Sequence, residues 1–339
     1  MSSVDIGIDL GTANIIITLG GKGIVLCEPS VVAYDKKKKR VIAVGGEASD
    51  MIGRTPEYII AAYPLRDGVI SDNYMTEIMV REFIRKVSGN MLVKPRVVLC
   101  VPSFVTDVER RALVEAAMLA GARKAYLIEE PVAALLGAGV DITKPNGVMV
   151  VDIGGGTTDI AVASFNGIVS SASIKLGGNK MDSAIIKYIH QKYKLIIGEK
   201  TAESAKKKLT NMYDPDGAAK MQVKGRSVIS GLPESVEISD LDIYEALSAY
   251  VEEIISNIRG VLEKTPPELV GDIHSNGLVL TGGGALLGGL DRLITQFVGA
   301  PCIIADRPIE CVARGVNKAF KHTGELLDGF EKISLYKYK

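Results

Sequence analysis

Three glycine-rich turns, each directly after an apolar run, are the segments of this sequence best suited to chemistry. They occupy residues 11–14 (GTAN), 153–158 (IGGGTT) and 281–284 (TGGG). Glycine lets a backbone approach a ligand closely, and successive N–H groups in a turn form a concavity suited to phosphate oxygens. The three turns therefore predict a binding site for a polyphosphate.

An aspartate stands at the end of the apolar run before each of the first two turns, at Asp9 and Asp152. Mg²⁺ dehydrates reluctantly and favours a few carboxylates together with phosphate oxygens. An aspartate here can also simply cap its own turn, but its presence in both places favours a role with a metal. We therefore expect Asp9 and Asp152 to hold Mg²⁺ through its water shell.

Several other kinds of site lack the necessary residues. The sequence contains no GxxxxGK[ST] motif, and neither of the first two glycine turns fits GxGxxG. His190, His274 and His322 have no second His or Cys nearby in the sequence, which disfavours a zinc site or a histidine-based triad.

Composition indicates a folded chain of two lobes. The 339 residues exceed what one ordinary core organises, and 47% hydrophobic with 24% charged residues is typical of globular proteins. Forty basic and forty acidic residues give a formal net charge of zero, so no global field attracts nucleic acid or an anionic bilayer. The basic run Lys36–Arg40 is expected to be a solvated turn between strands without a ligand.

The cysteines and the first residues place the chain in a reducing compartment. Cys27, Cys100, Cys302 and Cys311 show no CxxC spacing, so we expect reduced, cytosolic thiols. The opening MSSVDIGIDL is acidic where a signal peptide would be basic and then apolar, and no apolar run approaches the ~18 residues of a spanning helix. We expect neither secretion by that route nor membrane integration.

Hydrophobic periodicity predicts alternating strands and helices, hence an α/β fold. Pro131 marks the first turn of a helix, which places Glu130 at its N-terminus. Strands are expected at 4–9, 15–19, 23–34, 97–101, 125–128, 148–152, 159–164, within 222–238, and at 278–280 and 301–305. Helices are expected at 76–87, 106–120, 132–136, 181–193, 202–209, 241–264, 286–297 and 311–321.

The strand, turn and strand of residues 4–19 recur at 148–164, and in both copies an aspartate precedes the turn. A short loop ending in glycine and another apolar run follow each copy. Similarity at an offset of half the chain predicts two duplicated lobes whose turns open on a shared cleft.

Three segments in order resemble the phosphate 1, phosphate 2 and adenosine motifs of the actin, sugar kinase and Hsp70 ATPase superfamily. They are DLGTAN (9–14), DIGGGTTD (152–159) and LTGGGALL (280–287). A closer resemblance, from Asp5 to about Phe320, is to the MreB/Mbl family of bacterial actin homologues. It rests on CEPSVVA (27–33), GRTP (53–56), PLRDGVI (64–70), IEEPVAA (128–134), TPPEL (265–269) and CVARGVNKA (311–319).

The resemblance implies an actin-like α/β ATPase fold with two duplicated lobes, divided into four subdomains, around a nucleotide cleft. Subdomain IA would comprise residues 1–32, 67–144 and 316–339, and subdomain IB residues 33–66. Subdomain IIA would comprise residues 145–180 and 246–315, and subdomain IIB residues 181–245.

The resemblance also implies the residues that contact the nucleotide. The phosphates would lie between two sets of turn residues, Thr12, Ala13 and Asn14 on one side and Gly154, Gly155, Gly156 and Thr157 on the other. The nucleoside would lie against Gly283, Gly284 and Ala285, with Glu203 and Lys206 over the ribose and base. The segment TAESAKKKL departs from the acidic-Ile-Lys run of relatives, which weakens the assignment of Lys206 more than that of Glu203.

Glu130 in IEEP matches the family's catalytic acid, with Thr157 helping to hold the water that attacks the γ-phosphate; Glu129 is the alternative. A glutamate at a helix start is also favoured by the helix dipole alone, by roughly 0.3 to 1 kcal/mol. The residues by themselves thus leave a purely structural role open.

The implied function is an ATP- and Mg²⁺-dependent filament-forming ATPase that determines cell shape and organises cell-wall synthesis. Hydrolysis would be coupled to assembly and slow in the monomer, and nucleic acid would not be a partner. The filament would be cytoplasmic and would lie on the inner face of the membrane. Met91 and Leu92, in the loop 88–94, would attach it there. Burying these two side chains in the bilayer would contribute about 3 to 6 kcal/mol to membrane binding. Attachment would become firm only for a filament, because many protomers would then bind together.

Two other classes share the same ATPase fold. A small-molecule, sugar-type kinase would need an acceptor pocket with a catalytic aspartate, for which the sequence offers no convincing candidate. An Hsp70-type chaperone would need a peptide-binding domain after the ATPase unit, for which we expect no room.

Overall fold

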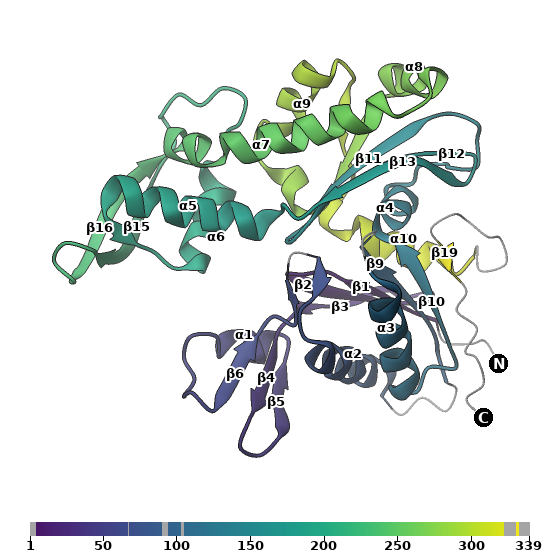
Figure 1. Cartoon of the computed structure of the whole chain (residues 1–339), viewed down its shortest axis with the longest axis horizontal. Coiled ribbons are helices and arrows are strands. Elements are labelled where there is room, and N and C mark those ends of the chain that lie inside the picture. The colour runs from purple at the N-terminus through teal and green to yellow at the C-terminus, as the bar shows by residue number, and fades with distance from the viewer. Residues whose placement is uncertain (1–4, 67, 90–93, 103–104, 322–329, 332–339) are drawn as a thin grey trace. The chain divides into compact units, whose positions relative to one another are not determined.

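The computed structural model describes residues 5–66, 68–89, 94–102, 105–321 and 330–331, arranged in two compact units (Figure 1). Unit 1 comprises Met1–Asn146, Ala163–Val169 and Ile309–Lys339, and unit 2 comprises Gly147–Val162 and Ser170–Pro308. Each unit has its own hydrophobic core. The division into four subdomains stays a prediction.

Unit 1 is built on a six-stranded sheet in the order β3-β2-β1-β9-β10-β19. Its strands are β1 (Asp5–Leu10), β2 (Asn14–Leu19), β3 (Gly23–Pro29), β9 (Arg96–Val101), β10 (Lys124–Glu129) and β19 (Phe330–Glu331). The first three form an antiparallel meander, whereas β1, β9 and β10 run parallel. The carboxyl ends of β1, β9 and β10 therefore lie at one edge of the sheet.

Helices cover both faces of this sheet. Side chains Ile6, Ile8 and Leu10 of β1 enter a core shared with α2 (Asn73–Ser88) and α3 (Asp107–Leu119). Because side chains alternate along a strand, Gly7 and Asp9 face the opposite side. There α10 (Cys311–Ala319) packs on β1, β2 and β9, and α4 (Glu130–Ala138) on β9 and β10.

A smaller sheet of β4 (Val32–Asp35), β5 (Arg40–Val44) and β6 (Ile59–Ala62) follows, with α1 (Gly46–Asp50) and the hairpin of β7 (Leu65–Arg66) and β8 (Val69–Ile70). The prediction of one continuous strand over 23–34 is wrong. The ladder stops at Pro29, which has no N–H to donate. Ser30 then turns the chain by donating from its backbone N–H to Ala13 and from its hydroxyl to Gly11.

Unit 2 contains a five-stranded sheet in the order β13-β12-β11-β17-β18. Its strands are β11 (Val148–Ile153), β12 (Thr158–Ser164), β13 (Gly167–Ile174), β17 (Leu278–Thr281) and β18 (Cys302–Ile304). Strands β11, β17 and β18 are parallel, as are β1, β9 and β10 in unit 1. The order matches β3-β2-β1-β9-β10, so the predicted duplication is confirmed in the strand topology.

The rest of unit 2 is mostly helical and packs around one long helix, α7 (Asp240–Glu263). The predicted stripe of α7, which includes Leu247, Ile254 and Ile258, is fully buried. The other elements are α5 (Gly178–Tyr193), β14 (Leu195–Ile196), α6 (Glu199–Leu209), β15 (Lys220–Ser227), β16 (Pro233–Ser239), α8 (Pro267–Asn276), α9 (Leu290–Val298) and the short 3₁₀ helix η1 (Gly283–Leu286). A second 3₁₀ helix, η2 (Pro308–Glu310), begins at the last residue of unit 2 and continues into unit 1.

The structure differs from the predicted helices most clearly at α8 and α9. The helix expected to start at Leu286 starts instead at Leu290, because Gly289 has a left-handed φ of 74° and separates α9 from η1. Helix α8 is absent from the predicted helices, because Pro266 and Pro267 directly after the helix predicted at 241–264 also fit a helix end. Proline is also favoured in a first helical turn, and Pro267 begins α8.

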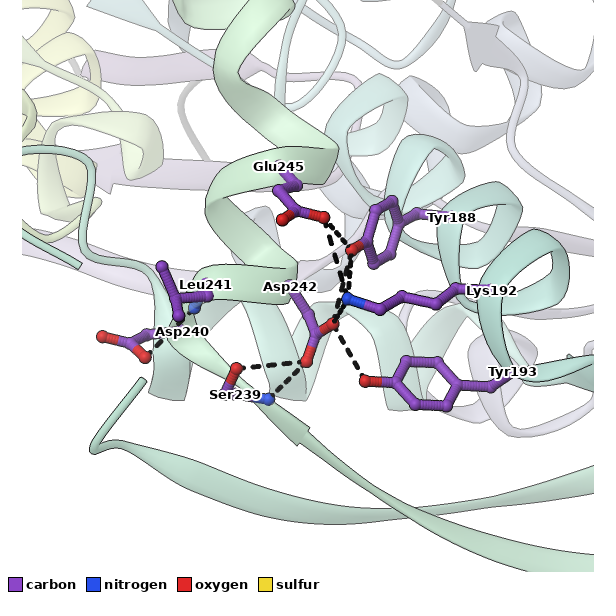
Figure 2. Close-up of polar contacts among 8 residues, drawn as sticks. All are labelled: Tyr188, Lys192, Tyr193, Ser239, Asp240, Leu241, Asp242 and Glu245. Carbon is purple, nitrogen blue, oxygen red and sulfur yellow. Dashed lines mark hydrogen bonds and ion pairs between the residues drawn. The ribbon is translucent and has the colours of Figure 1, made fainter. Parts of the chain in front are cut away.

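A polar cluster joins the end of α5 to the start of α7 (Figure 2). One carboxylate oxygen of Asp242 caps α7 by accepting the Ser239 N–H at 2.7 Å. Its other oxygen accepts from Lys192 at 2.7 Å and from the Tyr193 hydroxyl at 2.9 Å. Burial alone would raise the pKa of Asp242, but these donors outweigh it and the pKa is lowered. The carboxylate thereby links α5 to α7. These two helices contact the three-stranded sheet of β14, β15 and β16.

Within the described part of the chain, no helix is long and apolar enough to cross a membrane. None of Cys27, Cys100, Cys302 and Cys311, which all lie in the described part of the chain, takes part in a disulfide bond.

Helices α4 and α10 cross so closely that each requires a glycine at the contact. A Cβ on Gly137 would overlap the carbonyl of Cys311, and one on Gly315 would overlap the carbonyl of Ala133. These overlaps involve backbone atoms, which cannot swing away as a side-chain end can. The crossing therefore holds α4, with Glu130 at its N-terminus, against α10.

We predict that Gly315→Ala lowers the free energy of unfolding by about 3 kcal/mol or more, because the new methyl group overpacks a helix crossing. The measurement is urea denaturation followed by circular dichroism. Gly260→Ala in α7 is the matched control, since a Cβ there meets nothing within 4 Å; it should be neutral or stabilising by up to about 1 kcal/mol. Equal effects of the two substitutions would contradict the packing constraint.

Candidate functional site

Three chemically active side chains of unit 1 meet at the carboxyl ends of its parallel strands. Asp9 on β1 pairs in register with Cys100 on β9, and Glu130 follows directly after β10. One potential ligand atom from each of the three lies within 4.8 Å of the others. Asp9 is 9% exposed, Cys100 0% and Glu130 8%. The structure thus brings together Asp9 and Glu130, which the sequence predicted separately.

The two neighbouring glutamates have different surroundings. Glu130 is the first residue of α4, where the positive end of the helix dipole stabilises a carboxylate. The carboxylate of Glu129 forms an ion pair with Arg110 at 3.4 Å. Because Glu130 lies beside Asp9 and Glu129 is held by Arg110, the geometry favours Glu130 as the residue that acts on a substrate.

The turn after β1 is tightly built. A Cβ on Gly11 would lie 2.6 Å from the carbonyl oxygen of Asn14, so only glycine closes this turn. Thr12 is buried, and its hydroxyl accepts the N–H of Gly68 at 3.2 Å. Ala13 is partly exposed and Asn14 is exposed. A ligand can therefore reach Ala13 and Asn14 more easily than the buried Thr12.

The second glycine turn lies against the N-terminus of α5. The carbonyl of Gly154 accepts the N–H of Gly178 at 3.0 Å, and that of Gly155 accepts the N–H of Asn179 at 2.8 Å. A Cβ on Gly177 would lie 2.7 Å from both carbonyl oxygens. The turn closes on itself through the Gly154 N–H, which donates to Thr157 at 2.9 Å. Gly156 and Thr157 are buried within it.

Asp152 is a buried carboxylate at the start of this turn. It accepts the hydroxyl of Thr281 at 2.6 Å. Burial raises the pKa of Asp152 to about 7; Thr281 opposes this rise, and the charge of Asp159 adds to it. Without a cation or a further donor, ionisation of Asp152 at neutral pH is therefore incomplete.

The third glycine run packs directly onto the second. A Cβ on Gly282 would overlap the carbonyl of Ile153, and one on Gly284 would overlap its side chain. Gly282 also has a left-handed φ of 78°. Gly284 and Ala285 are buried, whereas Gly283 is exposed. The predicted phosphate and nucleoside segments of unit 2 are therefore neighbours.

Lys206 reaches the same region from α6. Its ammonium donates to the carbonyl of Gly178 at 2.8 Å and pairs with Asp182 at 2.9 Å. Burial raises the pKa of Asp182, and Lys206 partly offsets the rise. Glu203 pairs instead with the exposed Lys207 at 2.6 Å. Of the two predicted residues of this helix, the structure brings Lys206 and not Glu203 next to the glycine turn.

Cys100 lies beside Asp9 and Glu130, although the sequence does not predict it there. Its position corresponds in the duplicated sheets to Thr281, because Asp9 pairs in register with Cys100 as Asp152 does with Thr281. The sequence feature that could indicate this placement is the position of Cys100 near the end of the strand predicted at 97–101. In the sheet this strand pairs with the one that carries Asp9. Met91 and Leu92, the predicted membrane contacts, lie outside the described residues.

Comparison with known proteins identifies the family. Residues 3–328 match the MreB/Mbl protein family. The chain is 48% identical over 334 residues to the cell shape-determining protein Mbl of Bacillus subtilis (strain 168), covering 98% of both proteins. The chain belongs to the MreB/Mbl family.

Solved structures agree with this assignment. MreB5 of Spiroplasma citri bound to ADP has a TM-score of 0.89 and 39% identity, covering 94% of this chain and 97% of that one. The same protein bound to AMPPNP has a TM-score of 0.88 and 38% identity, covering 96% and 98%. The MamK double helical filament, at 21% identity and 94% and 99% coverage, shares the fold with a TM-score of 0.80.

The predicted fold class is thereby confirmed: this MreB/Mbl-family chain has the actin-like α/β fold. Membership of a family of cell shape-determining proteins makes it a cytoskeletal actin homologue.

We predict that Asp152→Asn stabilises this MreB/Mbl-family chain in the absence of ligand by about 2 to 4 kcal/mol at pH 8. The folded state holds a proton on Asp152 up to about pH 7, whereas the unfolded state releases it near 3.8. Wild-type stability should therefore fall, relative to that of the variant, as the pH rises from about 4 to 7, and level off above. Urea denaturation of both proteins at several pH values measures this, and a difference independent of pH would contradict it.

Proposed function

We propose that this chain is an ATPase that uses Mg-ATP to assemble into filaments. The observation that carries the proposal is the convergence of Asp9 and Glu130 at the carboxyl ends of the parallel strands of unit 1, in a chain whose relative MreB5 binds nucleotides. MreB5 has been solved with ADP and with AMPPNP, an analogue of ATP. The glycine turns at 11–14, 153–158 and 281–284 supply the backbone suited to phosphates and nucleoside.

Mg²⁺ would be held by Asp9 and Asp152 through water. The donor set suits this ion, because carboxylates at two strand ends beside phosphate turns are the ligands that Mg²⁺ accepts. The raised pKa of Asp152 is consistent with a residue that needs a cation to ionise fully at neutral pH. The bound ion would supply charge neutralisation for the phosphates.

The phosphates would contact Thr12, Ala13 and Asn14 in unit 1, and Gly154, Gly155, Gly156 and Thr157 in unit 2. The nucleoside would lie against Gly283, Gly284 and Ala285, with Glu203 and Lys206 near the ribose and base. For Lys206 the support is its bond to Gly178, which places a cation beside the phosphate turn. The turns would lie in a cleft bordered by the four subdomains.

Glu130 would orient the water that attacks the terminal phosphate and accept its proton, with Thr157 helping to hold that water. Phosphoryl transfer needs a positioned nucleophile and neutralised charge more than covalent participation by the protein. Hydrolysis would be slow in the monomer and coupled to assembly. The fold that the chain shares with the MamK filament supports self-association.

The filament would lie on the inner face of the cytoplasmic membrane and organise cell-wall synthesis. Relatives of this family are cell shape-determining proteins. Met91 and Leu92 would insert into the bilayer, weakly for one protomer and firmly for an array of protomers.

We predict that Glu130→Gln reduces the rate of phosphate release at saturating Mg-ATP by about 10² to 10⁴-fold, as expected for loss of a general base. Nucleotide affinity, measured with a fluorescent ATP analogue, should change little. Glu129→Gln is the matched control because Glu129 is paired with Arg110. Equal loss of hydrolysis in both variants, or full activity of Glu130→Gln, would contradict the assignment.

We predict that Met91→Ser combined with Leu92→Ser abolishes flotation with uncharged phosphatidylcholine vesicles while Mg-ATP-dependent filaments still form in solution. Two apolar side chains contribute about 3 to 6 kcal/mol per protomer when buried, and serine removes this contribution. Electron microscopy of filaments with and without a lipid monolayer separates the two properties. Failure of the wild type to form filaments under any nucleotide condition would contradict the proposed function itself.

A further inference from the structure

The turn between β4 and β5 concentrates positive charge on a chain that has none overall. Residues 36–40 are four lysines and an arginine, and all five side chains are exposed. The formal net charge of the whole chain is zero. The hairpin of β4 and β5 projects away from the six-stranded sheet of unit 1 (Figure 1). This basic turn, residues 36–40, takes no part in the nucleotide site.

The backbone of the basic turn is held in place. The buried carboxylate of Asp35 accepts the N–H groups of Lys37 at 2.9 Å and Lys38 at 3.0 Å. The N–H of Lys36 donates to the carbonyl of Tyr58 at 2.9 Å. Lys39 adopts a left-handed φ of 49° to close the turn. The lysines are therefore presented from a fixed backbone.

The charge of the basic turn is not neutralised within the chain. Among the residues that the structure describes, no ion pair involves a side chain of 36–40. Asp35, the adjacent acid, is used by backbone N–H groups, and the ammonium of Lys37 lies 4.4 Å from the centre of the Tyr58 ring. Exposed lysines elsewhere do have acidic partners, such as Lys207 with Glu203 and Lys220 with Glu237.

We propose that the basic turn binds the anionic headgroups of a membrane surface. A projecting hairpin tip can approach a flat surface without needing a complementary groove. Lysine acts as a hydrated point charge, whereas sites that bind a phosphate group through two directed hydrogen bonds favour the planar guanidinium of arginine. Stacking on nucleic-acid bases needs a free aromatic face, and one face of Tyr58 is occupied by Lys37. These features favour a lipid surface as the binding partner over nucleic acid or an acidic protein with a complementary binding groove.

This contact rests on the proposed membrane location of the filament, but it acts through charge. Each lysine or arginine near an anionic surface strengthens binding by about fivefold at moderate ionic strength. Met91 and Leu92 would act by burying apolar surface, which salt does not screen. The basic turn therefore makes attachment depend on lipid charge and on salt, whereas apolar insertion alone would not.

The test is flotation of the full chain with Mg-ATP on vesicles of phosphatidylcholine, with or without about 30% phosphatidylserine, at about 50 and 500 mM salt. A variant with Gln at positions 36–39 is compared with one that carries Arg at the same four positions. We expect the wild type and the Arg variant to prefer anionic vesicles at low salt. The Gln variant should bind them at least about 25-fold more weakly.

Equal binding of wild type and Gln variant to anionic vesicles would overturn the role of the turn while leaving the proposed membrane function intact. If the wild type forms filaments but floats with neither vesicle, the membrane part of the proposed function fails, and the role of the turn fails with it. Loss of filament assembly by the Gln variant without lipid would assign the turn to a contact between copies instead. Urea denaturation confirms that each variant is folded.

Discussion

Buried carboxylates at the ends of parallel strands constrain the rest of the structure. Asp9 and Asp152 end equivalent strands of two duplicated sheets, and each is almost completely shielded from water. Burial of an ionised carboxylate is strongly unfavourable unless donors or a cation compensate, so each aspartate needs a specific surrounding. In unit 2 the effect is visible in the pKa of Asp152, which burial raises to about 7. The folded state thus retains a group that a nucleotide-bound cation would stabilise.

Close backbone packing around these carboxylates explains several of the glycines. Gly282 and Gly284 let the third turn lie on Ile153, directly beside Asp152. In unit 1, a Cβ on Gly7 would overlap the hydroxyl of Thr18 and approach Val316 of α10 to 2.9 Å. Gly137 and Gly315 hold α4 against α10 in turn. Glycine therefore serves the site in two ways, by shaping the turns and by letting helices approach the sheet that carries the acids.

The sequence predicted the features that follow from local pattern. The duplicated hairpins, the buried stripe of α7 and the helix beginning at Glu130 all depend on periodicity or on turn residues near in sequence. Other features depend on contacts between residues distant in the sequence. The break at Ser30 depends on bonds to Gly11 and Ala13, and the place of Cys100 beside Asp9 depends on strand register. Neither the pairing of Glu129 with Arg110 nor the exposure of Glu203 can be read from spacing.

The two duplicated sheets carry different side chains at the ends of their equivalent strands. At matching positions unit 1 places the thiol of Cys100 beside Asp9, and unit 2 places the hydroxyl of Thr281 beside Asp152. A hydroxyl is a strong hydrogen-bond donor and a thiol a weak one, so Asp152 is tied within unit 2 by a short bond of 2.6 Å. Unit 1 adds Glu130 at the N-terminus of α4 beside Asp9, whereas unit 2 adds the second and third glycine turns and Lys206. The two units have thus diverged in chemistry: unit 1 places two carboxylates, Asp9 and Glu130, side by side, whereas unit 2 places the carboxylate of Asp152 beside two glycine turns.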